Sequence, residues 1–154
     1  MFATPKSLFR VLAFAEAVTW TLLITGLIVR ATIGLDVAVS IGGAIHGFIF
    51  LTYGATAVLL TVNQRWSVGT AILTVGSAVI PYATIPVELW LARTGRLDGA
   101  WRTEASDHPR DAGWVDRTMR WFLNHPIVLV VLVAGAVIVL FVVLVNAGPP
   151  GGNE

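Results

Sequence analysis

The sequence predicts an all-α membrane protein in which four transmembrane helices form a bundle and a short interfacial amphipathic helix precedes the fourth. Two observations support this fold class. Hydrophobic residues make up 56% of the 154 residues and charged residues only 12%, a balance outside the usual range of soluble domains. Four stretches of the chain are also apolar over roughly twenty residues each, the length of helix that crosses the hydrocarbon core of a bilayer.

The four predicted spans are Phe9 to Val29, Val37 to Val62, Val68 to Leu91 and Pro126 to Val145. The first is interpreted as a retained span and not as a signal peptide, because it is longer than a typical signal core and carries Glu16 within it. The predicted organisation is a three-span core (9–93), a polar loop with an amphipathic segment (94–125), a fourth transmembrane helix (126–147) and a disordered tail (148–154).

The amphipathic segment is expected between Gly113 and Leu123, where Val115, Met119 and Phe122 recur at helical spacing. Tryptophan rings favour the headgroup region of a bilayer, and arginine side chains reach towards it from an apolar surface. The segment is therefore expected to lie on the membrane surface, either as a tether for the fourth span or as a surface for a partner. Its predicted interfacial residues are Trp114, Arg117, Arg120 and Trp121.

The orientation prediction rests on the excess of Lys and Arg in cytoplasmic loops. With four spans, one side collects Arg30 and the six arginines between Arg93 and Arg120, whereas the other collects Lys6, Arg10 and Arg65. The first and third loops are thus predicted to be cytoplasmic, with both termini outside.

Three ionisable residues fall within the predicted spans, namely Glu16, His46 and Glu88. A charge in hydrocarbon costs at least a few kcal/mol and is seldom left unpaired. The Tyr53 hydroxyl is expected to donate to Glu16, and His46 is expected near Tyr82.

Pro81 adds to this set, because proline removes a backbone hydrogen bond and frees a carbonyl. The predicted intramembrane polar site is therefore Glu16, His46, Tyr53, Pro81, Tyr82 and Glu88. The alternative is that Glu16 and His46 are satisfied locally and only specify helix pairing, and that Glu88 reaches the membrane surface and meets Arg93.

Gly43 and Gly47 form a G-x-x-x-G pair that frames His46 in the second span. Such spacing lets helices approach closely in lipid. The pair is predicted to serve helix packing, either inside the bundle or between subunits.

The residues from about Phe9 to Arg93 resemble a family of small bacterial integral membrane proteins catalogued as a domain of unknown function. The resemblance is carried by Arg10, by Glu16-Ala17-Val18-Thr19, by Gly43-Ala44-Ile45-His46-Gly47 with Phe50 and Tyr53, by Trp66, and by Ile80-Pro81-Tyr82. Arg30 and Ala83 depart from the family pattern. The resemblance implies a bacterial cytoplasmic membrane protein with an added fourth span, and it implies no activity.

Several kinds of chemistry find no support in the sequence. The chain has no Cys, and it contains none of the nucleotide-binding, nucleophile or zinc-protease motifs. Asp107, His108 and Asp111 are interpreted as part of a solvated loop and not as metal ligands. No catalytic residue, metal site or cofactor is predicted, and the scattered basic residues do not favour nucleic acid.

Two functions remain open. The first is a non-enzymatic accessory or scaffold subunit of a larger membrane complex, with lipid and another membrane protein or a homo-oligomer as partners. The second is a small proton-coupled carrier or permease in which His46 exchanges a proton with Glu16 or Glu88.

Overall fold

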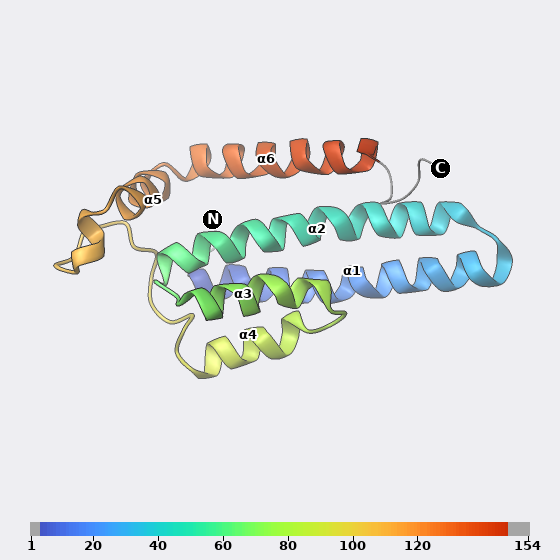
Figure 1. Ribbon diagram of the computed structural model, residues 1–154, viewed down its shortest axis with the longest axis horizontal. Coiled ribbons are helices and arrows are strands. Elements are labelled where there is room, and N and C mark those ends of the chain that lie inside the picture. The colour runs from blue at the N-terminus through green and yellow to red at the C-terminus, as the bar shows by residue number, and fades with distance from the viewer. Residues whose placement is uncertain (1–3, 148–154) are drawn as a thin grey trace.

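Two long antiparallel helices form the axis of the protein (Figure 1). The computed structural model describes residues 4–147, and all regular elements in that range are helical. Helix α1 (Pro5–Ile33) begins with a capping box between Thr4 and Ser7, and α2 (Asp36–Asn63) runs back beside it. Gly34 allows the tight reversal, because it ends α1 with a left-handed φ of 72° that favours glycine.

Three helices are long and apolar enough to cross a membrane, namely α1, α2 and α6 (Pro126–Ala147). They coincide with the first, second and fourth predicted spans to within a few residues at each end. The all-α membrane fold class is therefore confirmed. The predicted disordered tail lies outside the described residues.

The third predicted span, Val68 to Leu91, is not one continuous helix, and the four-span count is not confirmed. It forms α3 (Val68–Gly76), the 3-10 helix η1 (Ser77–Val79), a turn over residues 80–83, and α4 (Thr84–Arg93). Figure 1 shows that α4 reverses direction and returns towards the end where α3 began. We call α3, η1, the turn and α4 the re-entrant hairpin.

Two prolines explain the break. Ile80 is extended, with φ −104° and ψ 123°, as the residue before a proline prefers to be. Pro86 then lies in the first turn of α4, where its missing N–H costs no helical hydrogen bond. A new helix therefore begins after Pro81 instead of the old one continuing.

One end of the bundle gathers most of the polar segments, and we call it the polar end. The start of α1, the end of α2 and both ends of the re-entrant hairpin meet there. Trp66 before α3 donates from Nε1 to the carbonyl of Arg96 after α4 at 2.9 Å, and Lys6 pairs with Asp98 at 3.1 Å. The opposite end, at Gly34, we call the far end.

The aromatic core lies in the half of the bundle next to the polar end. Phe9 packs against Tyr53 and Trp66, with ring centroids 5.2 and 6.2 Å away. Leu60, Leu91 and Leu97 complete this fully buried cluster. Burial of Leu97 shows that the polar loop begins as a packed segment.

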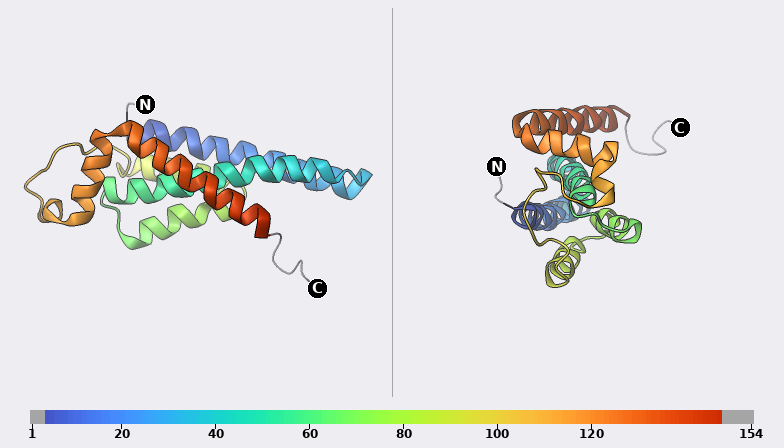
Figure 2. Two further views of the ribbon diagram at one scale, coloured as in Figure 1. Left: turned by 90° about the horizontal axis from the view of Figure 1, so that it is seen from above. Right: turned by 90° about the vertical axis from the view of Figure 1, so that its left-hand side faces the viewer.

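The remaining elements extend the core at its edge. After η2 (Pro109–Ala112), helix α5 (Trp114–Asn124) confirms the predicted amphipathic helix, and α6 crosses α2 obliquely (Figure 2). The first two helices extend towards the far end beyond α6 and the re-entrant hairpin in the left view of Figure 2. Most apolar side chains of α6 are exposed, as expected of a helix that faces lipid.

Candidate functional site

The candidate site lies between α1 and α2, about 17 to 21 Å along α1 from its start at 1.5 Å per residue. Glu16 on α1 is 0% exposed and His46 on α2 is 8% exposed. The His46 Nδ1 lies 3.9 Å from Glu16 Oε1. The structure therefore brings these two predicted residues together.

Thr19 is the third member of this site, which the sequence analysis did not single out. Its hydroxyl donates to the Glu16 carbonyl at 3.0 Å and lies 3.2 Å from His46 Nδ1. An i, i+3 spacing from Glu16 places it on the same face of α1. That spacing was the signal available in the sequence.

Two glycines permit the close approach of α1 and α2 near this site. A Cβ atom on Gly26 would lie 2.7 Å from the Ala38 carbonyl oxygen, and one on Gly42 would lie 2.9 Å from the Leu22 carbonyl oxygen. Both obstacles are backbone atoms of the facing helix. The predicted pair behaves differently, because Gly43 meets only a side chain at 3.8 Å and Gly47 meets Phe141 of α6 at 3.4 Å.

The re-entrant hairpin covers one side of the site. Trp20 lies against the His46 ring, with centroids 4.4 Å apart, and donates from Nε1 to the carbonyl of Ala78 in η1 at 3.2 Å. The Tyr82 hydroxyl lies 3.3 Å from the Thr21 hydroxyl. Tyr82 therefore contacts α1 through Thr21, and its expected position near His46 stays a prediction.

Tyr53 and Glu88 also have partners other than the expected ones. The buried Tyr53 hydroxyl donates to the Thr74 carbonyl at 3.2 Å instead of to Glu16. Glu88 is 0% exposed and accepts from Arg10 Nε at 2.9 Å instead of meeting Arg93. Both corrections have one cause, which is that the re-entrant hairpin brings α3 against Tyr53 and returns α4 to the start of α1.

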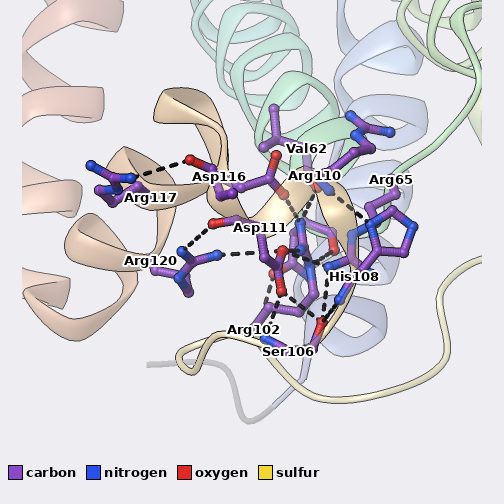
Figure 3. Close-up of polar contacts among 12 residues, drawn as sticks. Val62, Arg65, Arg102, Ser106, His108, Arg110, Asp111, Asp116, Arg117 and Arg120 are labelled. Atoms are coloured by element: carbon purple, nitrogen blue, oxygen red, sulfur yellow. Dashed lines mark hydrogen bonds and ion pairs between the residues drawn. The ribbon is translucent and has the colours of Figure 1, made fainter.

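A second polar cluster ties the loop to the polar end (Figure 3). Asp111 is 5% exposed and accepts from Arg65 and from Arg102, the latter at 2.9 Å. The Ser106 hydroxyl and amide also donate to this carboxylate, and together with Arg65 they hold the pKa of Asp111 well below its usual range.

Arg102 joins this cluster to the end of α2. Its guanidinium donates to the carbonyls of Val62 and Asn63 and pairs with Asp116 at 2.8 Å. Free carbonyls at a helix C-terminus favour such a cation. The segment from Arg102 to Asp111 is thus anchored at its two ends, and residues 103–110 between them are exposed, as expected of a solvated loop.

The predicted interfacial residues lie on or beside this cluster. Trp114 and Trp121 are 77% and 51% exposed. Arg117 donates to the Ala112 carbonyl, and Arg120 donates to the Asp111 carbonyl. The two tryptophans leave α5 with exposed aromatic surface, and their position at a membrane surface stays a prediction.

An all-helical fold with three helices of membrane-spanning length, α1, α2 and α6, defines an integral membrane protein. Residues 6–93 match the family model described as "Domain of unknown function (DUF3817)", and the chain belongs to this family. The match contains Glu16, Thr19, His46 and the re-entrant hairpin, whereas the polar cluster, α5 and α6 follow it.

A relative from Streptomyces coelicolor, provisionally named a membrane protein, is 36% identical over 88 residues. The aligned part is 56% of this chain and only 10% of the relative. No solved structure matches the chain.

Proposed function

We propose that the protein is a non-enzymatic accessory subunit of a larger membrane complex. The observation that carries this proposal is the exposed turn of the re-entrant hairpin, where Ile80 is 62% and Tyr82 is 45% exposed. The turn contacts Thr21, about 24 Å along a helix of about 43 Å. Non-helical backbone at such a depth is tolerated only where protein or a water-filled cavity covers it.

Two further facts support the proposal that another protein covers the exposed turn of the re-entrant hairpin. Helix α6 packs on α2 and lies on the opposite side of the bundle from the hairpin turn in Figure 1 and in the right view of Figure 2. The Streptomyces relative carries the matching segment within a polypeptide of which it is 10%. A module that occurs inside a long membrane protein is well suited to pack against other membrane segments.

A photo-crosslinking amino acid at position 80 tests the proposal in native membranes. We expect a crosslink from position 80 to one larger membrane protein. The matched control is position 138, because Ile138 of α6 is similarly exposed at 51% and is expected to reach lipid. Labelling of lipid alone from both positions would refute the accessory role.

We further propose that the polar end is cytoplasmic. Nine of the ten Lys and Arg residues belong to segments at that end, and Arg30 alone lies near the far end. The Lys6–Asp98 pair supports this proposal, because it holds the beginning of the third loop beside the start of α1, whereas the sequence-based orientation placed the two on opposite sides. Under the present proposal the start of α1 is inside and α6 ends outside.

The absence of Cys from the chain makes this orientation simple to test. Single cysteines are placed at Asp107 in the loop and at Leu35 at the far end, and intact cells are treated with a membrane-impermeant maleimide. We expect labelling of Leu35→Cys in intact cells and of Asp107→Cys only after permeabilisation. The opposite pattern would refute the orientation.

A proton-coupled carrier is the second candidate, favoured by the burial of Glu16 beside His46. Purified protein in liposomes would then move protons or a solute in a pH gradient, and His46→Gln would abolish the movement. Transport by the protein alone would overturn a purely accessory role.

A further inference from the structure

We infer that Glu16 and His46 form a binding site for one exchangeable proton within the membrane. The inference goes beyond the accessory role and does not depend on it, because it concerns groups buried inside this chain. Its ligand is the proton itself, held by the carboxyl group of Glu16 or by the imidazole of His46.

The first step is the lack of any hydrogen-bond donor for Glu16. The side chain is 0% exposed, and neither carboxylate oxygen has a hydrogen-bond partner within residues 4–147. A carboxylate in such surroundings is strongly disfavoured unless a cation or a donor compensates its charge. The site therefore needs one positive charge to be neutral.

The second step fixes the proton on one ring nitrogen of His46. The Thr19 hydroxyl donates its hydrogen bond to the Glu16 carbonyl, so a lone pair of its oxygen faces His46 Nδ1 at 3.2 Å. With the hydroxyl hydrogen directed to the Glu16 carbonyl, we assign a hydrogen to Nδ1 in both the neutral and the charged ring. Nε2 is left as the position where the ring gains or loses a proton.

The proton balance of the pair follows from this assignment. With one exchangeable proton bound, the site is either a neutral carboxyl beside a neutral imidazole or a carboxylate beside an imidazolium. The two forms differ only in the position of that proton. Its loss leaves a net negative charge with no compensation, and a second proton leaves a net positive charge.

Within residues 4–147, the neighbouring elements supply no other charge to the pair. On the polar-end side, Arg10 of α1 is held by Glu88 of α4 at 2.9 Å, so these two charges compensate each other. Tyr53 of α2 is bonded to Thr74 of α3 and lies 3.1 Å from the hydroxyl of Ser77 in η1. On the α6 side, the facing residue at Gly47 is the apolar Phe141. Among the described residues, His46 is the one cationic group within ion-pair distance of Glu16.

Infrared spectroscopy of the purified protein in liposomes tests the inference directly. The carboxylic C=O stretching band of Glu16 is followed in H₂O and D₂O between about pH 5 and 8, the range in which histidine changes charge. We expect a band that shifts in D₂O and loses intensity as the pH rises. It should be absent from Glu16→Gln and retained in the matched control Glu88→Gln.

The variants separate a proton site from a folding defect. Glu16→Gln keeps the shape of the side chain, and its helix content by circular dichroism should equal that of the wild type. His46→Gln should keep the carboxyl band and change the pH at which it disappears. The inference would be overturned if neither the Glu16 carboxyl band nor the His46 ring bands changed between about pH 5 and 8, or if the bound proton did not exchange with deuterium.

Discussion

The packing of α1 against α2 makes Gly42→Ala and Gly26→Ala the most informative substitutions for stability. Each would place a Cβ atom under 3.0 Å from a carbonyl oxygen of the facing helix, at Leu22 or Ala38. An ordinary contact needs 3.4 Å or more, and a backbone oxygen cannot rotate away. The two helices must therefore separate by several tenths of an ångström.

The expected loss of stability follows from a comparison of Gly42 with its neighbour Gly43 on α2. Overpacking costs about 1 to 3 kcal/mol, whereas replacing a helical glycine by alanine gains up to about 1 kcal/mol. Gly43→Ala has the second effect without the first, because its Cβ would lie 3.8 Å from a Leu23 side-chain atom. The difference between Gly42→Ala and Gly43→Ala is thus about 1 to 3 kcal/mol, and every 1.4 kcal/mol is about tenfold in the unfolding equilibrium.

The assay is reversible unfolding in mixed micelles, followed by circular dichroism for the wild type and the three alanine variants. We expect Gly42→Ala and Gly26→Ala to unfold at lower denaturant than Gly43→Ala. Equal stability of Gly42→Ala and Gly43→Ala would refute the conclusion that Gly42 is a point of backbone contact.

Three further predictions concern the polar end. Arg102→Lys should lower the free energy of unfolding by about 1.5 to 3 kcal/mol, since lysine cannot reach the α2 carbonyls and Asp116 together. The same micelle assay measures this change, and an unchanged free energy of unfolding would contradict the bridging role of Arg102. Because the folded-state pKa of Asp111 is lowered, its stabilisation is present above the unfolded value of about 4 and is lost only as the pH falls towards the folded value. Asp111→Asn should therefore unfold at a lower temperature than the wild type at neutral pH. In strong acid the unfolding temperatures of the two proteins should converge. Glu88→Gln should lower the free energy of unfolding, because it leaves the charge of Arg10 without its partner. Adding Arg10→Gln should restore part of that free energy, and a double-mutant cycle measures the effect.

The sequence allowed prediction of the elements whose pattern is local. The bounds of α1, α2 and α6 follow from uninterrupted apolar length, and α5 follows from helical spacing of Val115, Met119 and Phe122. Hydropathy does not distinguish one long helix from two short ones that double back, because both bury the same apolar residues. The informative signal was Pro86, five residues after Pro81, since a second proline suits the first turn of a new helix.

The site was predicted in part for the same reason. Glu16 and His46 lie on the two helices whose pairing follows from a two-residue connection, and the structure brings them to 3.9 Å of each other. The partners of Tyr53 and Glu88 depend on where α3 and α4 return, which no local pattern encodes. The contact between the helices was not assigned to Gly26 and Gly42, because Gly26 is the one glycine inside α1 and Gly42 lies beside the more conspicuous Gly43–Gly47 pair.

The re-entrant hairpin also explains why the basic residues appeared to be divided between two sides. A spanning helix from Val68 to Leu91 would carry the arginines after it to the side opposite Arg10. A hairpin returns the chain to the side it left, so the same arginines join Arg10 and Arg65 at the polar end. The charge distribution then favours a single orientation. The turn that reverses the chain is the same exposed turn for which we propose a covering partner, so one feature of the fold underlies both the orientation and the accessory role proposed for the protein.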